Sequence, residues 1–398
     1  MPCISRKVES IVESPIRKIT ALIAAAKYDK ELISFGGGAP SLAPPREVVE
    51  AITKALRDDA QKATSYGATR GNIYVIESII NDLKSYGVSI DAEQLIITEG
   101  ATEGIWLAVT SLIEKGQEVI ATDPTYIGYE TPTELVDARL VRVPTSWENE
   151  FQPDLELVKE KINDRTRAFI LVSPCNPTGR VLKEEVLRGI ADLAEDHDLW
   201  IIFDDTYKDI YYEGRYIPIF NIGNASERTV VVFTMSKSAS IPGCRVGYTY
   251  APKEAIRAME KLKQFVTLCP SMIGQIATKA FYSNGVKERY LKEIVLPTYS
   301  HRKETMGKFL SEYIPDCGYS TPKGAFYYFV DLSNYLREMG MNEEQFQEAL
   351  YKEKRVIVIP GRFFGERGKN HVRMTFVAES DERIESGIKK MGEFLRAV

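Results

Sequence analysis

Short runs of apolar and β-branched residues alternate along the chain with segments whose apolar positions recur every three to four residues. The first pattern predicts buried strands, and the second predicts amphipathic helices. Because the two alternate between residues 95 and 233, we expect an α/β fold with a mostly parallel sheet sandwiched by helices. The predicted strands are 95–98, 118–122, 140–144, 168–173, 199–204 and 229–233, and the predicted helices between them include 105–113 and 183–197.

The pattern changes after residue 252, where helices dominate before a second group of strands begins. This change predicts a large domain over 46–285 and a smaller α+β domain over 286–398, bridged by a long helix at 286–313. The remaining predicted elements are a helix at 254–266, strands at 325–332, 356–359 and 371–377, and helices at 343–353 and 381–396.

Helices are also predicted before the alternating region. The spacing of Ile16, Ile19, Leu22 and Ile23 fits an amphipathic helix better than the core of a signal peptide. A strand-like run at 32–35 then precedes three consecutive glycines. Two further helices follow, one after Pro44-Pro45 with Val48, Val49, Ile52 and Leu56 on one face, and one at 73–86.

Composition narrows the class of protein. A chain of 398 residues exceeds what one core usually serves, and a net charge of −5 without a basic run does not suggest a nucleic-acid partner. Its 5 cysteines are scattered without a Cys-x-x-Cys pair, and its 3 histidines are dispersed, so we expect neither a disulfide framework nor a metal site. With no apolar run near the ~20 residues needed to span a bilayer, we expect a cytoplasmic protein without membrane contact.

The most informative residue for chemistry is Lys237, which follows the apolar strand 229–233. Hydroxyl groups surround it in sequence, and Arg245 lies eight positions further on. A lysine amine can form a Schiff base with an aldehyde, while hydroxyls and a guanidinium can hold a phosphate. The stretch therefore indicates covalently held pyridoxal phosphate, with a solvated strand end as the simpler alternative.

Other polar residues follow predicted strands and would meet Lys237 at one edge of the sheet. Asp204 could keep the pyridine nitrogen protonated, so that the ring acts as an electron sink. Asn176 and Tyr207 could donate hydrogen bonds to the ring oxygen, and Tyr126 could stack on the ring. Taken singly, Asp204 and Asn176 could equally be turn residues.

Two anion sites complete the predicted chemistry. We interpret residues 99–104 as a turn before a helix, whose N–H groups near Ala101 and Thr102 could bind phosphate. The hydroxyls of Thr102, Thr234 and Ser236 and the guanidinium of Arg245 would complete that cup. Arg373 lies in an apolar strand, where either a substrate carboxylate or an internal ion pair would balance its charge.

In order and spacing, these residues resemble the class I/II aminotransferases of the fold-type I pyridoxal phosphate enzymes. The resemblance extends from residue 38 to residue 373. The matching stretches are Gly38-Ala39-Pro40, Tyr66 with Gly71, Gly100-Ala101-Thr102-Glu103-Gly104, Pro124-Thr125-Tyr126, Asn176-Pro177-Thr178-Gly179, Asp204 with Tyr207, Ser236-Lys237 with Pro242-Gly243-x-Arg245-x-Gly247-Tyr248, Pro322-x-Gly324, Pro360-Gly361 and Arg373.

The resemblance implies a ping-pong transfer of an amino group from an L-amino acid to a 2-oxoacid, with Lys237 moving the proton at the α-carbon. It also implies a homodimer with shared active sites, in which Tyr66 reaches the neighbouring subunit's cofactor phosphate. Gly38 would lie beside the substrate carboxylate, and segment 1–45 would join the small domain. The glycine-rich start looks most similar to the kynurenine, aminoadipate and aromatic branch, although Val75-Ile76 replaces the Leu-Arg of many relatives.

Two other functions remain open at this point. A carbon–sulfur lyase or a ring-forming amino acid synthase would use the same residues for its first steps. A ligand-sensing regulator with an aminotransferase-like domain would need an attached DNA-binding module, for which no residues are left over. The amino donor also stays open among aromatic, aliphatic, 2-aminoadipate and glutamate candidates.

Overall fold

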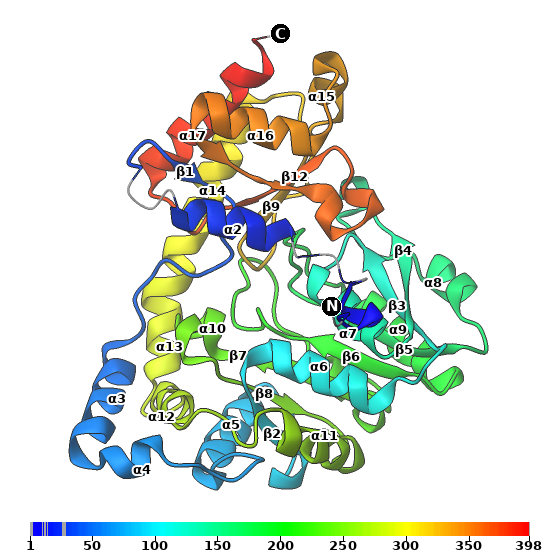
Figure 1. Ribbon diagram of the computed structural model, residues 1–398, viewed down its shortest axis with the longest axis vertical. Coiled ribbons are helices and arrows are strands. Elements are labelled where there is room, and N and C mark those ends of the chain that lie inside the picture. Colours follow the sequence, from blue (N-terminus) through cyan, green and yellow to red (C-terminus); the bar gives the residue numbers. More distant parts are fainter. Residues whose placement is uncertain (1–2, 10, 12, 14, 26–28, 398) are drawn as a thin grey trace.

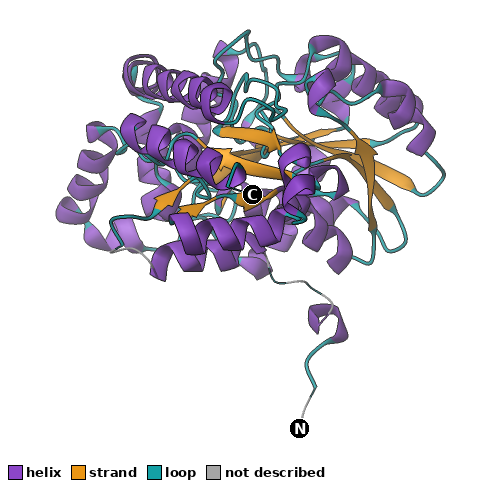
Figure 2. Cartoon of the chain, turned by 90° about the horizontal axis from the view of Figure 1, so that it is seen from above, coloured by secondary structure: helices purple, strands orange, loops and turns teal. Residues whose placement is uncertain are grey.

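The computed structural model describes residues 3–9, 11, 13, 15–25 and 29–397. A seven-stranded sheet with the order β2-β8-β7-β6-β5-β3-β4 forms its centre, and helices cover both faces (Figure 1, Figure 2). β8 runs antiparallel to its neighbours β2 and β7, and the other pairings of this sheet are parallel. The strands are β2 (Leu95–Thr98), β3 (Glu118–Asp123), β4 (Arg139–Pro144), β5 (Thr166–Val172), β6 (Trp200–Asp204), β7 (Thr229–Thr234) and β8 (Gly247–Tyr250).

Alternate residues of the central strands enter two separate cores. In β7, Val230 and Val232 pack toward α6 and α11, whereas Val231 and Phe233 belong to the core beneath α5 and α9. This division follows from the two-residue period of a strand, and it explains why β7 is apolar throughout. The helices of this part of the chain are α3 (Arg46–Asp58), α4 (Ala60–Thr64), α5 (Ile73–Ser85), α6 (Gly100–Leu112), α7 (Glu130–Leu135), α8 (Leu155–Lys161), α9 (Glu184–Asp196), α10 (Met235–Ser238), α11 (Lys253–Val266) and α12 (Met272–Phe281).

The C-terminal part contains a second, antiparallel sheet with the order β11-β12-β9. β1 near the N-terminus pairs in parallel with β10, so two distant segments lie side by side (Figure 1). A helical run of α13, a π-helical turn and α14 extends from α12 to α17. The elements are α1 (Arg6–Glu9), α2 (Pro15–Ala25), β1 (Ile33–Ser34), α13 (Val286–Tyr290), the π turn (Leu291–Val295), α14 (Leu296–Tyr313), β9 (Tyr327–Asp331), α15 (Ser333–Met339), α16 (Glu343–Lys354), β10 (Val356–Ile357), β11 (Ile359–Pro360), β12 (His371–Thr375) and α17 (Asp381–Leu395).

The interpretation of residues 99–104 as a turn is wrong, because α6 already begins at Gly100. The small residues here bring the helix close to the sheet. A Cβ atom on Gly104 would lie 2.6 Å from a methyl carbon of Val232. Small side chains weaken the periodic apolar signal, which is why the sequence pattern placed the helix start five residues too late.

The face predicted for α3 is not a single buried face. Val48 is buried, but 47% of Val49 and 41% of Leu56 are exposed. The sequence pattern also missed β8 and α12. No helix in the described part of the chain is long and apolar enough to cross a membrane.

Candidate active site

The predicted residues other than Tyr66 converge where the parallel strands end. Thr234 closes β7, and its side chain accepts a hydrogen bond from the Ser236 amide, which starts the short helix α10. This turn carries Lys237 back over the sheet edge, where its Nζ donates to the Gly38 carbonyl at 2.5 Å. Burial, followed by the like charge of Arg373, lowers the pKa of Lys237 to about 8, although Asp204 opposes the shift. Near neutral pH, part of this amine is therefore unprotonated.

Asp204 ends β6 and is 4% exposed. Its carboxylate accepts hydrogen bonds from the Tyr129 hydroxyl at 2.8 Å and the Thr206 amide at 3.1 Å. Burial raises its pKa above the ordinary value, while Thr206, Tyr129 and the charge of Lys237 act against that rise. A buried carboxyl group held in this way is well suited to a cationic ligand group.

Arg373 lies in β12 and is 2% exposed. Its guanidinium donates to Asn176 Oδ1 at 3.0 Å and to the Gly36 carbonyl at 2.8 Å. No carboxylate forms an ion pair with Arg373 within the described residues, and its Nε has no hydrogen-bond partner there. The internal ion pair considered as an alternative is therefore absent from this part of the chain. A buried guanidinium without a carboxylate partner is suited to an external carboxylate.

The glycine run links these two cations. The Gly36 carbonyl meets Arg373, and the Gly38 carbonyl meets Lys237. Gly38 lacks a side chain for a packing reason, because a Cβ atom there would lie 2.8 Å from the Tyr327 hydroxyl oxygen. The segment after β1 therefore forms one wall of the site.

The aromatic residues of the site pack at right angles to one another. The Tyr207 hydroxyl lies 2.8 Å from the Tyr327 hydroxyl, and the two rings meet edge to face. The Tyr126 ring lies edge to face with Tyr129 at 5.4 Å. Burial, followed by the negative charge of Asp204, raises the pKa of Tyr126. The Tyr126 hydroxyl is therefore close enough to this carboxylate to be affected by its charge.

The residues predicted to bind phosphate lie around the start of α6. Thr102 is exposed in its first turn, and Gly100 has a φ of +75°. Arg245 donates to the carbonyls of Glu99 and Pro242, each at 3.1 Å, which brings its guanidinium to this helix N-terminus. On the other side, the Thr234 hydroxyl donates to Ser236 Oγ at 2.8 Å. Free amide groups, hydroxyls and a cation together make an anion site.

Comparison with known proteins gives this geometry a context. Residues 30–391 match the family model described as aminotransferase class I and II. The chain belongs to this family. It is a pyridoxal phosphate-dependent aminotransferase with the fold of that group.

The relatives share most of their length with this chain. An aspartate aminotransferase of Pyrococcus horikoshii is 34% identical over 93% of this chain and 92% of its own. The aromatic-amino-acid aminotransferase 2 of Thermococcus litoralis is 30% identical over 99% of this chain and 98% of its own. The structure of the Thermus thermophilus aspartate aminotransferase with maleate superposes with a TM-score of 0.92 at 29% identity, covering 100% of both chains.

The site of this aminotransferase fits its cofactor. Lys237 offers a buried amine of lowered pKa, and Asp204 offers a buried carboxylate for the ring nitrogen. Arg245 and the N-terminus of α6 would hold the phosphate, and the Arg373 Nε is a buried donor still without a partner among the described residues. Each group that pyridoxal phosphate needs has a counterpart here.

Tyr66 is the predicted residue that does not join the others. It is 84% exposed, and no hydrogen bond or ring contact connects it to the other site residues in the described part of the chain. The role that the resemblance implies for Tyr66 lies in a second subunit.

Sequence reasoning missed three residues of the site. Tyr129 and Thr206 hold Asp204, and Tyr327 contacts Tyr207, Arg373 and the region of Gly38. A signal existed for Tyr327, because it follows the matching stretch Pro322-x-Gly324 at the start of a strand. Tyr129 gave a weaker signal, three residues after Tyr126.

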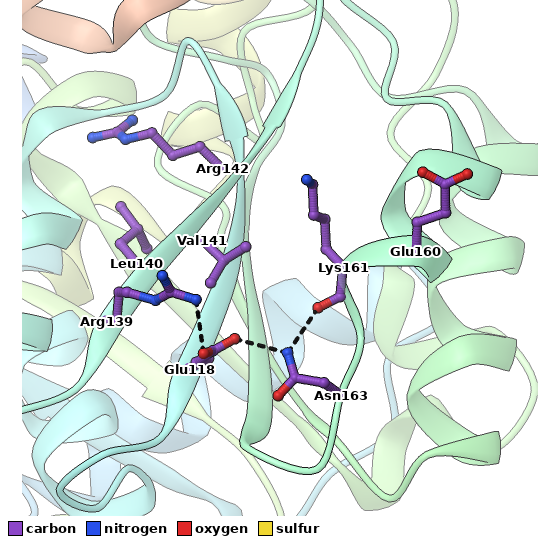
Figure 3. A pocket seen from close by; sticks show the side chains of 8 residues that line it. All are labelled: Glu118, Arg139, Leu140, Val141, Arg142, Glu160, Lys161 and Asn163. Carbon is purple, nitrogen blue, oxygen red and sulfur yellow. Dashed lines mark hydrogen bonds and ion pairs between the residues drawn. The ribbon is translucent and has the colours of Figure 1, made fainter.

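A separate groove of about 430 Å³ lies at the β3–β4 edge of the sheet (Figure 3). Its buried carboxylate, Glu118, is paired with Arg139 at 2.8 Å and Arg165 at 2.6 Å and accepts a bond from Asn163. None of the predicted catalytic residues lines it. Because its buried carboxylate is already paired with two arginines, we assign this groove a structural role.

Proposed function

We propose that the aminotransferase reaction of this chain depends on Lys237 as the reacting amine and on Arg373 as the clamp for the substrate α-carboxylate. The observation that carries this proposal is the buried guanidinium of Arg373, which lacks a carboxylate partner among the described residues. A carboxylate bound there would be near the amine, because the carbonyls of Gly36 and Gly38 contact the two cations.

Lys237 is suited to move a proton at the substrate α-carbon. A general base works best when its pKa lies near the working pH, and burial brings this pKa to about 8. When bound, pyridoxal phosphate supplies an electron-withdrawing ring that makes this proton acidic. Lys237 can then take the proton from one carbon and return it to another, which is what exchange between an amino acid and a 2-oxoacid requires.

The other residues hold the reacting groups in place. Asp204 would keep the ring nitrogen protonated, Asn176 and Tyr207 would donate to the ring oxygen, and Tyr126 would stack on the ring. Ala101, Thr102, Thr234, Ser236 and Arg245 would bind the phosphate. The buried hydrogen bonds of Asp204 and the position of Arg245 at the start of α6 support these roles.

We also propose a homodimer in which Tyr66 completes the neighbouring subunit's phosphate site. Its 84% exposure supports this role. Residues 1–45 would form a segment of the small domain 286–398, with 46–285 as the large domain, and the pairing of β1 with β10 supports that division. The five free cysteines favour a cytoplasmic location.

The test is a half-reaction with a panel of donors that includes aspartate and phenylalanine, the donor classes named for the relatives. We expect wild type to release the 2-oxoacid of its preferred donor and to yield a cofactor-labelled Lys237 peptide after borohydride reduction. Lys237→Ala should do neither. A Lys237→Ala variant that kept the visible cofactor absorbance of wild type and released the 2-oxoacid at the wild-type rate would refute the proposal.

Arg373→Leu tests the carboxylate clamp separately. We expect kcat/KM for the amino acid to fall about 100-fold, since a charge-assisted carboxylate contact is removed. Activity on the methyl ester of the same amino acid should change much less, because the ester lacks the charge. Arg139→Leu, at the groove of Figure 3, is the matched control and should leave both substrates unchanged. Equal losses on acid and ester in Arg373→Leu would exclude the clamp.

A further inference from the structure

Tyr327 lies at the meeting point of the two halves of the site. It starts β9 and is 1% exposed. In the register of β9 and β12, Tyr327 pairs with Thr375 and Phe329 pairs with Arg373. Tyr327 and Arg373 are therefore diagonal neighbours on one face of the sheet. The Arg373 guanidinium carbon lies 4.5 Å from the centroid of the Tyr327 ring.

The hydroxyl of the same residue points the other way. It lies 2.8 Å from the Tyr207 hydroxyl and would be 2.8 Å from any Cβ atom at position 38. Tyr327 is thus in contact with the carboxylate clamp through its ring and with the predicted ring-oxygen donor through its hydroxyl.

Which of the two hydroxyls donates to the other decides where the Tyr207 proton can go. A phenol has one proton to donate, so Tyr207 can give it either to Tyr327 or to the cofactor ring oxygen. If Tyr327 is the donor, the Tyr207 proton is free for the cofactor. Burial, followed by Tyr327 itself, raises the pKa of Tyr207, and burial raises that of Tyr327, so both remain protonated donors.

Building on the function proposed above, we propose that Tyr327 is a positioning residue that donates a hydrogen bond to the Tyr207 hydroxyl oxygen. This bond directs the Tyr207 proton toward the cofactor ring oxygen and strengthens the hydrogen bond between them. Chains of hydrogen bonds polarise one another, so donation to the Tyr207 oxygen makes its own proton a better donor. Burial raises the pKa of the Tyr327 phenol, but the nearby positive charge of Arg373 acts to lower it and so makes Tyr327 a better donor.

The consequence is an effect on the acid–base behaviour of the cofactor-linked Lys237 nitrogen. A stronger donor to the ring oxygen stabilises the form in which that oxygen carries negative charge and the nitrogen has lost its proton. Tyr327→Phe removes one hydroxyl and keeps the ring. We expect the midpoint of the pH-dependent visible absorbance of the cofactor-loaded enzyme to rise by about 0.3 to 0.6 pH unit, because only the strengthening of the Tyr207 hydrogen bond is lost.

The controls separate this role from a structural one. Tyr328→Phe removes a buried hydroxyl from the next residue of β9, where it bonds to the Lys303 carbonyl at 3.1 Å and not to the site. Its midpoint should equal that of wild type. Tyr207→Phe should raise the midpoint more than Tyr327→Phe, and adding Tyr327→Phe to Tyr207→Phe should give no further shift, because Tyr327 acts through Tyr207.

The outcomes distinguish this inference from the function it rests on. If Lys237→Ala keeps the pH-dependent absorbance, the proposed role of Lys237 fails. If Lys237→Ala loses it while the Tyr327→Phe midpoint stays within about 0.2 unit of wild type, or falls, the Tyr327 inference alone is overturned. A full Tyr327→Phe shift that persists in the Tyr207→Phe background would also overturn it, as would an equal shift in Tyr328→Phe.

Discussion

Lys237 carries an amine whose surroundings favour its neutral form. Burial is the first cause and the charge of Arg373 the second, and together they lower its pKa to about 8 from the ordinary 10.5. Because only a neutral amine attacks an aldehyde, capture of pyridoxal phosphate by cofactor-free protein should accelerate as pH rises and level off above its pKa. Stopped-flow absorbance should give a midpoint near pH 8.

The same measurement on Arg373→Leu provides a matched comparison. Removing the neighbouring positive charge should move the midpoint upward, since the protonated amine is then less disfavoured. Arg139→Leu, in the outer groove, should leave it unchanged. A wild-type midpoint near pH 10 would show that the amine is not desolvated as described.

At the residue scale, the sequence singled out charged side chains that the fold brings together, but it did not identify the side chains that hold them in place. Asp204 stands out because a carboxylate follows an apolar strand. Nothing in the sequence links it to Tyr129, which is 75 positions away and bonds to it only in the folded chain. Hydroxyl partners depend on tertiary contacts, and one tyrosine among 21 has no local signature that distinguishes it.

At the scale of elements, the start of α6 sets the geometry of the proposed phosphate site. Gly100 has a φ of +75°, and a Cβ atom there would lie 2.7 Å from Arg245 Nη2. Gly100→Ala should therefore both strain the backbone and displace the guanidinium. We expect the dissociation constant for pyridoxal phosphate to rise about tenfold, from the loss of one charge-assisted contact. Fluorescence titration of the cofactor-free variant would measure it.

Gly214 offers a control with the same backbone geometry. Its φ is also +75°, but no atom lies within 4 Å of the Cβ position. Both substitutions to alanine should lower stability by about 1 kcal/mol, because an L residue is disfavoured in the left-handed region. Only Gly100→Ala should weaken cofactor binding. Equal cofactor affinities in the two variants would mean that the Arg245 position does not depend on Gly100.

The predicted elements were reliable where apolar periodicity was strong. The buried strands β5, β6 and β7 and the helix α9 lie within two residues of the expected ranges. The start of α6 and the strand β8 were not found. α6 begins with small residues that pack on the sheet. β8 is a strand of four residues, and its place between β2 and β7 depends on pairing with β2, which is far away in the sequence. Local patterns do not contain this information.

At the scale of the whole molecule, exposed apolar side chains gather around α12. They lie on α3, the loop before α5, the start of α5 and the end of α11, which follow one another along the lower part of Figure 1. α12 packs against both α3 and α5, and Gly67 of the loop approaches the sulfur of Met272. An exposed apolar patch of this kind is a candidate for the interface of the proposed dimer. Its members are Val49, Leu56, Tyr66, Ile73, Tyr74, Phe265, Val266 and Leu268.

This patch predicts how the proposed dimer can be broken. Phe265→Glu places a charge on a side chain that is 87% exposed in the single chain. We expect light scattering to find twice the mass of one chain for wild type and the mass of one chain for the variant. Gln345→Glu adds the same charge at the start of α16, where an acidic residue suits the helix, and should remain dimeric. A monomeric wild type would contradict the prediction.

Sharing of the site between subunits makes a stronger prediction, which concerns mixtures of two inactive variants. In a homodimer of Lys237→Ala every site lacks the amine, and in a homodimer of Tyr66→Ala every site lacks the neighbour's hydroxyl. A hybrid dimer combines both defects in one site and leaves the other intact. After unfolding and refolding an equal mixture at limiting pyridoxal phosphate, half the dimers are hybrids, so about a quarter of wild-type activity should return. If Tyr66 instead served its own subunit, every hybrid site would keep one defect and the mixture would stay as inactive as its parents.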